Sequence, residues 1–303
     1  MEDQSSISLT DEGVSLDARA TMRLAIPQAL FALNELDVHY DEGVAALWTF
    51  MAPSDRPSFT PSMLSDFEHW QRLISQGFGP GGVPLRYLIL GSRSPGVFCF
   101  GGDLELFYSL IRAEDRDGLI AYGYRCVEIL NRNINALDLP MVTFGLVQGQ
   151  ALGGGFEALL SFDFIVAERG SRFGLPEVAF GLFPGMGAHA LLSRKLGTAM
   201  ADRLILKNET YSAEDMYDLG IVHHLAEPGE GVSTMHDLLK RCERRHVGLC
   251  NARKAMRIVS PVLLEEMKQI VELWADTALH LRDQDLKMMR RLAEAQVKLA
   301  QAS

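Results

Sequence analysis

Short apolar runs of strand length alternate along this chain with segments whose apolar residues recur at helical spacing. Four such runs lie at residues 44–51, 85–90, 141–147 and 162–167, and segments with helical spacing lie at 63–73 and 119–137. Strands that are apolar along their whole length need cover on both faces of a sheet, and helices between consecutive strands supply that cover. The sequence therefore predicts an α/β fold.

The residue pattern changes near residue 25 and again near residue 230. Residues 1–25 are rich in Asp, Glu, Ser and Thr and lack a basic stretch followed by an apolar one, so we expect a flexible lead-in and no export signal. Strands and helices alternate from residue 26 to about 230, and the helix that begins at Ser212 ends before Gly220. Residues 231–303 have helical spacing almost throughout. We therefore expect an α/β core at 26–230 and a helical C-terminal region at 231–303.

Net charge and residue composition indicate which kinds of binding partner and which cellular compartment to expect. A net charge of −10 argues against a general binder of nucleic acids or membrane surfaces, because such proteins gain affinity from clustered Lys and Arg. The densest basic run, at residues 241–246, is interpreted as a solvated helix face. The four cysteines lack CxxC spacing, and no stretch approaches eighteen apolar residues. We expect a cytoplasmic protein with free thiols.

The apolar run at 141–147 leads directly into a glycine cluster that ends in an acid. Gly153 and Gly154 come just before Glu157 in the segment GQALGGGFE. Glycines at a helix start leave backbone N–H groups open to a developing negative charge. A second acid, Glu177, follows Pro176, which stiffens the chain before it. The two carboxyl groups can flank one ligand and serve as acid and base.

Several other kinds of site have no support in the sequence. No HExxH or HxxxH motif and no Cys/His cluster predicts a metal site, and His189, His223 and His224 are interpreted as surface or structural histidines. No GxGxxG follows a strand, and neither a GxxxxGK[ST] nor a GxSxG motif is present. We expect neither a metal nor a nucleotide cofactor.

Four segments, at residues 97–104, 149–157, 173–177 and 181–187, resemble the enoyl-CoA hydratase/isomerase (crotonase) superfamily in order and spacing. The resemblance covers roughly residues 40–230. It implies a core of repeated ββα units wound into a spiral, with a helical C-terminal region that takes part in oligomerisation and closes the acyl pocket. It also implies a homo-trimer or hexamer and an acyl thioester as substrate.

The resemblance further implies roles for individual residues. Gly102 and Gly154 would donate backbone N–H groups to the thioester oxygen, with Gly101 as a substitute for Gly102, and Gly101 and Gly153 would contact the substrate. Glu157 and Glu177 would be the catalytic pair. Two glutamates imply a hydratase or dehydratase, since isomerases of the superfamily commonly use one acid. Glu177 is expected to act at C2 and Glu157 to position or deliver water, whereas Asp103 is expected to cap a helix.

Within the superfamily, the segments around residues 149–158, 176–188 and 211–214, together with 272–278, resemble bacterial diffusible signal factor (DSF) synthases. This implies a dehydratase with thioesterase activity. It would convert a 3-hydroxyacyl group on acyl carrier protein (ACP) to a cis-2-enoyl thioester and then release a cis-2-unsaturated fatty acid for quorum sensing. Met186, Trp274 and Leu292 would line the acyl pocket, although each also suits an ordinary core.

Two alternatives stay open. One is an enoyl-CoA hydratase of fatty-acid oxidation, which would act on CoA thioesters. The other is a non-catalytic protein that uses the same scaffold to bind a partner such as the receiver domain of a sensor kinase. The presence of both Glu157 and Glu177 favours catalysis.

Overall fold

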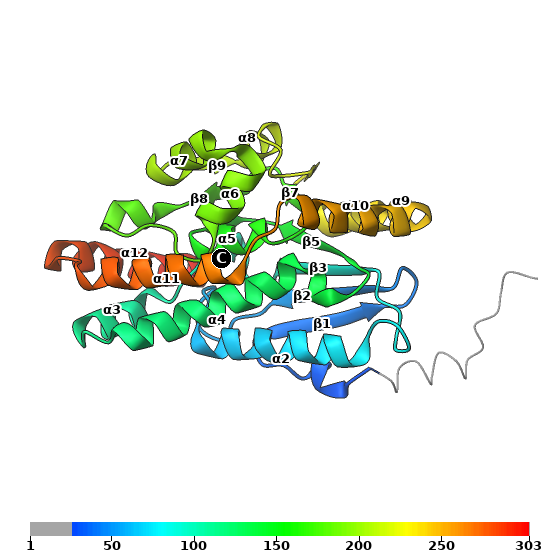
Figure 1. Ribbon diagram of the computed structural model, residues 1–303, viewed down its shortest axis with the longest axis horizontal. Coiled ribbons are helices and arrows are strands. Elements are labelled where there is room, and N and C mark those ends of the chain that lie inside the picture. The colour runs from blue at the N-terminus through cyan, green and yellow to red at the C-terminus, as the bar shows by residue number, and fades with distance from the viewer. Residues whose placement is uncertain (1–25, 303) are drawn as a thin grey trace, which may run out of the picture.

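The computed structural model describes residues 26–302, and the predicted lead-in at 1–25 lies outside the described residues (Figure 1). The strands form two sheets. The larger sheet has the order β1-β2-β3-β5-β7-β10 and consists of β1 (Leu36–Asp41), β2 (Ala46–Met51), β3 (Tyr87–Ser92), β5 (Val142–Val147), β7 (Phe164–Glu168) and β10 (His224–Ala226). The smaller has the order β4-β6-β8-β9 and consists of β4 (Val97–Cys99), β6 (Gln150–Leu152), β8 (Arg172–Gly174) and β9 (Thr210–Ser212).

The helices connect these strands and form the C-terminal region. They are α2 (Pro61–Gly77), α3 (Leu104–Arg112), α4 (Arg116–Ile134), α5 (Gly154–Leu160), α6 (Ala188–Leu196), α7 (Thr198–Leu206), α8 (Ala213–Asp218), α9 (Gly231–Cys242), α10 (His246–Val259), α11 (Leu264–Leu279) and α12 (Asp283–Ala302). Short 3₁₀ helices lie at η1 (Gln28–Phe31), η2 (Ala136–Asp138), η3 (Pro176–Phe180) and η4 (Glu243–Arg245). In the described part of the chain, no helix has both the length and the apolar character of a membrane span.

The predicted α/β fold with repeated ββα units is confirmed. Three times in succession, a strand of the large sheet is followed by a strand of the small sheet and then by a helix: β3-β4-α3, β5-β6-α5 and β7-β8-η3. The four predicted apolar runs correspond to β2, β3, β5 and β7, each of which begins one or two residues later than expected. These strands are neighbours and pair in parallel.

Helices cover both faces of the large sheet, as predicted. On one face, α9 contributes Met235 and Leu239 to a cluster with Tyr87 and Phe144. On the other face, α2 and α4 pack against the sheet, and Trp70 of α2 donates a hydrogen bond from Nε1 to Thr49 Oγ1 at 3.0 Å. This bond satisfies a buried polar pair inside an otherwise apolar layer.

The strands of the small sheet, which are the second strands of the ββα units, were not located from the residues, and this sheet positions the site. Its strands have three residues each, too few for the alternation of a strand to show in the sequence. The strands β4, β6 and β8 pair in parallel. Their carboxyl ends therefore lie at one edge, and the segments that follow them, at residues 100–103, 153–157 and 175–177, come together there.

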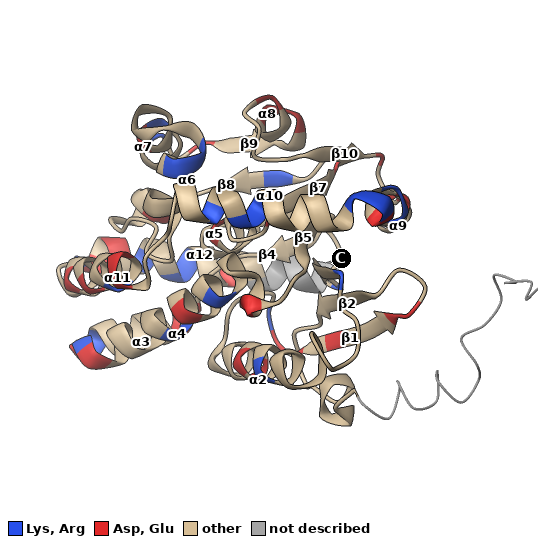
Figure 2. Ribbon diagram, turned by 45° about the vertical axis from the view of Figure 1, so that its right-hand side comes forward, with Lys and Arg blue, Asp and Glu red and all other residues tan. Residues whose placement is uncertain are grey.

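Helix α10 is attached to the core largely through charged groups. None of its residues is buried, and Arg241, Arg244 and Arg245 of the basic run before it are exposed, as predicted. Figure 2 shows in blue the Lys and Arg positions along α9 and α10. Arg257 Nη2 lies 2.7 Å from Asp163 Oδ1, and Arg253 Nε lies 3.1 Å from the same oxygen. The other oxygen of this buried carboxylate accepts the Thr143 N–H at 3.1 Å.

We expect Asp163→Ala to lower the free energy of unfolding by about 3 kcal/mol, because it leaves a buried N–H and two arginines without their acceptor. Urea denaturation measures the loss, and hydrogen exchange should show faster exchange in α10. The control is Asp37→Ala, which removes an ion pair with Arg93 that is half exposed on both sides and is worth at most about 1 kcal/mol. Equal losses in the two variants would contradict the anchoring role of Asp163.

Candidate active site

Three backbone segments meet at the carboxyl edge of the small sheet. A Cβ atom added to Gly101 would lie 2.5 Å from the Gly154 nitrogen, and one added to Gly154 would lie 3.4 Å from the Gly102 nitrogen. Real Cβ atoms do not approach backbone atoms as closely as the first of these distances. Glycine at position 101 is therefore a steric requirement of this meeting point, where its φ of +92° also disfavours other residues.

Two N–H groups at this point are free. Gly154 is the first residue of α5, and neither its N–H nor that of Gly102 has a hydrogen-bond acceptor among residues 26–302. The N–H of Gly101 differs, because it donates to Cys99 Sγ at 3.3 Å. Gly102 and Gly154, the predicted pair of donors, thus have N–H groups without an acceptor in this part of the chain, whereas Gly101, the predicted substitute, does not.

A buried tyrosine holds the Gly102 segment in place. The Tyr122 hydroxyl donates to the Phe59 carbonyl at 2.6 Å and accepts the Asp103 N–H at 3.2 Å, while the Phe59 N–H donates to the Gly101 carbonyl at 2.7 Å. Burial raises the pKa of Tyr122 well above its ordinary value, so the hydroxyl stays neutral. No signal in the sequence points to this role, because Tyr122 occupies a regular core position of a helix.

Asp103 caps helix α3, as predicted. Its Oδ1 accepts the Leu106 N–H at 3.1 Å and lies 2.7 Å from Arg56 Nη2. The ion pair with Arg56 was not predicted, since the two residues lie far apart in the sequence. It holds Asp103, the residue after Gly102, through its side chain, whereas Tyr122 holds it through its N–H.

Glu157 lies in the first turn of α5 and is buried. Its Oε1 accepts two backbone N–H groups, from Met186 and Ala188, each at 2.9 Å. Burial raises the pKa of Glu157 to about 7, and the two N–H groups limit the rise because they stabilise the carboxylate. Glu157 can therefore gain or lose a proton near neutral pH.

Glu177 lies in η3 next to the same glycines. A Cβ atom added to Gly153 would lie 2.6 Å from Glu177 Oε1. Its Oε2 is buried and has no hydrogen-bond donor among the described residues. Burial and the charge of Glu157 raise the pKa of Glu177 well above its ordinary value. Both carboxyl groups thus hold a proton more tightly than an ordinary glutamate, and only Glu157 receives backbone donors that stabilise its carboxylate.

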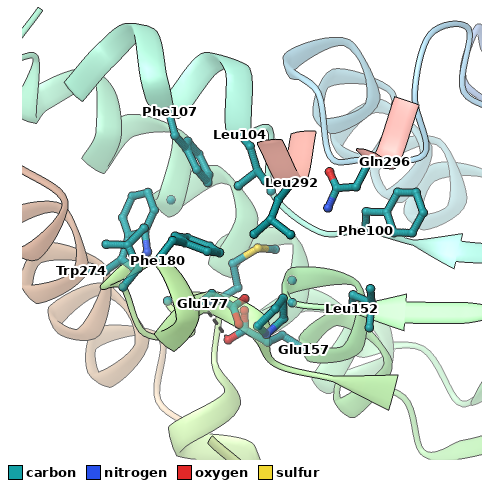
Figure 3. Close-up of a pocket in the computed structure, with 18 of the residues that line it drawn as sticks. Phe100, Leu104, Phe107, Leu152, Glu157, Glu177, Phe180, Trp274, Leu292 and Gln296 are labelled. Atoms are coloured by element: carbon teal, nitrogen blue, oxygen red, sulfur yellow. Dashed lines mark hydrogen bonds between the residues drawn. The ribbon is translucent and has the colours of Figure 1, made fainter. Parts of the chain in front are cut away.

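Both carboxyl groups open into one cavity of about 180 Å³. Glu157 and Glu177 lie together on one side, and Leu104 of α3 and Leu292 of α12 lie opposite them (Figure 3). The predicted residues Gly102, Gly153, Gly154, Met186, Trp274 and Leu292 all line this cavity, whereas Gly101 does not. No Lys, Arg, His, Ser or Cys side chain belongs to the lining as described.

The histidines lie apart from this cavity. His223 Nδ1 accepts the Ile165 N–H at 3.1 Å, which gives it a structural role, and His189 packs against Phe183. Across residues 26–302, no three side chains of the metal-binding types gather in one place. The chemistry that the described site offers is therefore that of two carboxyl groups and two backbone N–H groups.

Comparison with known proteins gives matches along most of the chain. The family model "Enoyl-CoA hydratase/isomerase" matches residues 84–246. The short-chain-enoyl-CoA hydratase of Clostridium acetobutylicum is 36% identical over 110 residues, which are 36% of this chain and 41% of that protein. The match thus spans less than half the length of that relative.

Solved structures share the fold. The human mitochondrial delta3-delta2-enoyl-CoA isomerase superposes with a TM-score of 0.72 at 17% identity, covering 86% of this chain and 98% of that one. The enoyl-CoA hydratase of Bacillus halodurans superposes with a TM-score of 0.71 at 19% identity, covering 85% of this chain and 100% of that one. An isomerase and a hydratase fit about equally well, so the fold alone does not select the reaction.

The raised pKa of Glu157 predicts a pH-dependent stability. The folded protein keeps this proton up to about pH 7, whereas an ordinary glutamate loses it near 4.5. The folded state therefore binds more protons between these values, and its free energy of unfolding falls as the pH rises, by at most about 1.4 kcal/mol per pH unit. Above pH 7 the decrease that is due to Glu157 ends.

Glu157→Gln keeps an oxygen for the Met186 and Ala188 N–H groups but has no proton to lose. We expect this variant to gain stability relative to the unsubstituted protein between pH 5 and pH 8, as measured by urea denaturation. Glu128→Gln, at an exposed position on α4, is the control and should show no such gain. A difference between Glu157→Gln and the unsubstituted protein that is the same at pH 5 and pH 8 would argue against a raised pKa.

Proposed function

The chain belongs to the enoyl-CoA hydratase/isomerase family, and on this basis we propose that it adds water to, or removes water from, the C2–C3 bond of an acyl thioester. One observation carries the proposal. Two carboxyl groups with different proton affinities share one side of a cavity that also contains two free backbone N–H groups. Hydration needs one group to take a proton and another to give one, and both are present.

The geometry supports a division of roles. The thioester oxygen accepts hydrogen bonds from the Gly102 and Gly154 N–H groups, which stabilise the enolate by several kcal/mol. Glu157 takes a proton from the water that attacks C3, and Glu177 gives its proton to C2. Dehydration is the reverse, with Glu177 removing the C2 proton and Glu157 protonating the departing hydroxyl. This division matches the expectation that Glu177 acts at C2.

We expect Glu157→Gln and Glu177→Gln each to lower kcat for crotonyl-CoA hydration by about 10²- to 10⁴-fold, because each removes one proton transfer. Loss of the enoyl absorbance measures the rate, and circular dichroism checks the fold. Glu128→Gln should keep the rate of the unsubstituted protein. Full activity in either active-site variant would remove that glutamate from the mechanism.

A second candidate is the DSF-synthase reaction. The three side chains that the resemblance assigned to an acyl pocket, Met186, Trp274 and Leu292, do line the cavity with the two glutamates, which suits an apolar chain. A 3-hydroxyacyl thioester on ACP would first lose water. Water activated by a glutamate would then attack the thioester carbonyl, and the two N–H groups would stabilise the oxyanion that forms there. The C–S bond would then break, the ACP thiol would leave with a proton, and the free acid would be released.

Purified protein should therefore be incubated with a panel of 3-hydroxyacyl-ACPs and, separately, with crotonyl-CoA, and the products identified by mass spectrometry. The DSF-synthase candidate predicts free cis-2-enoic acids. Hydration of crotonyl-CoA without release of a free acid would favour an enoyl-CoA hydratase of fatty-acid oxidation. Binding of a receiver domain with turnover of neither thioester would favour the non-catalytic alternative.

The predicted homo-trimer or hexamer is supported by α10. This helix exposes Val247, Met256, Ile258 and Val259, apolar side chains that a second copy of the chain would cover. Light scattering will test the assembly, and a mass of 33.6 kDa, that of one chain, would contradict it.

A further inference from the structure

A second cavity lies behind Met186. Its volume is about 30 Å³, and most of its wall comes from α2 and α4, with Ala158 of α5 and Leu90 of β3 among the other members. Met186 is the one residue that lines both this cavity and that of the two glutamates as described. The flexible side chain of Met186 is therefore the direct contact between the rear cavity and the active site.

The wall of the rear cavity is almost entirely hydrocarbon, with Leu64, Ile129 and Leu130 among its members. The amide nitrogens of its two polar amides are engaged: Gln71 Nε2 donates to the Ile129 carbonyl at 2.9 Å, and Asn133 Nδ2 donates to Ser161 Oγ at 2.8 Å. Only the amide oxygens of Gln71 and Asn133 lack a donor within the described chain. Two acceptors are the minimum that holds a water molecule, whereas the apolar wall suits the end of a hydrocarbon chain.

Met186 is fixed at its backbone and adaptable at its side chain. Its N–H donates to Glu157 Oε1 at 2.9 Å, so the main chain is tied to the active site. Its sulfur packs on Gly154, where an added Cβ atom would lie 2.6 Å from Sδ. An unbranched thioether with three rotatable bonds can change rotamer without moving the backbone. Such a change would connect the two cavities.

We propose that the rear cavity is a distal subsite for the end of an acyl chain, and that rotation of Met186 opens it. This inference rests on the proposed function, since the chain reaches the subsite from a thioester bound at Gly102 and Gly154. Met186 then sets the longest acyl chain that the enzyme accepts. The subsite is apolar, so it selects by length.

A larger side chain on α4 should fill the rear cavity and so exclude the end of a long acyl chain. Leu130→Phe adds volume from α4, and Leu119→Phe makes the same change on the same helix at a buried position that lines neither cavity. We would measure kcat/KM for trans-2-enoyl-CoA thioesters of increasing chain length. Leu130→Phe should lower the ratio of long-chain to short-chain kcat/KM at least tenfold, and Leu119→Phe should leave the ratio within twofold. An unchanged ratio in Leu130→Phe, or an equal fall in both variants, would overturn the subsite.

A second variant and a xenon-pressurised crystal test the subsite even if Leu130→Phe fails to fold. Ala158→Val adds less volume to the same cavity. It should also lower the ratio of long-chain to short-chain kcat/KM. Crystals of the unsubstituted protein under xenon should show the gas in the rear cavity, because dry apolar cavities bind it. An ordered water bound to Gln71 and Asn133 in its place would overturn the proposal. Absence of turnover at every chain length would refute the proposed function and with it the acyl subsite, whereas normal short-chain turnover with an unchanged length ratio would refute the subsite alone.

Discussion

The active site depends on two backbone segments that approach each other more closely than side chains allow. Gly101 lies against the Gly154 nitrogen, and Gly155 lies against the Cys99 carbonyl, so a Cβ atom at either position would push the segments apart. This contact holds the Gly102 and Gly154 segments together. Gly153, at the start of the second segment, leaves the space that Glu177 Oε1 occupies, because a Cβ atom there would lie 2.6 Å from this oxygen. Glycines thus make room for both the donors and the acid pair.

Electrostatics then distinguishes two side chains of the same type. Both glutamates are removed from water, and two carboxylates so close together cannot both ionise easily. Glu157 receives two backbone N–H groups from Met186 and from Ala188 at the start of α6, whereas Glu177 Oε2 receives no donor from the described residues. Burial, mutual repulsion and these backbone donors therefore distinguish the two glutamates, with no further charged side chain in the cavity as described.

Much of the fold and of the site could be predicted from the sequence, because their signals are local. The central strands are long apolar runs, and the glycines and acids lie in short motifs. The small sheet was missed because three residues are too few to show a period. Tyr122 and Arg56 were missed because they act on the Gly102 segment from distant parts of the chain. The pKa values of Glu157 and Glu177 follow from burial, which no local pattern contains.

The position of the cavity roof has a consequence for biosynthesis. Leu292, Ala295 and Gln296 close the cavity from α12, whereas the acids and donors lie between residues 102 and 177. Synthesis runs from the N-terminus, so α12 leaves the ribosome more than a hundred residues after the acid pair. Until α12 docks, the pocket is open to water, and hydrated carboxyl groups keep ordinary proton affinities. Docking of α12 dries the pocket and so raises the proton affinities of both glutamates.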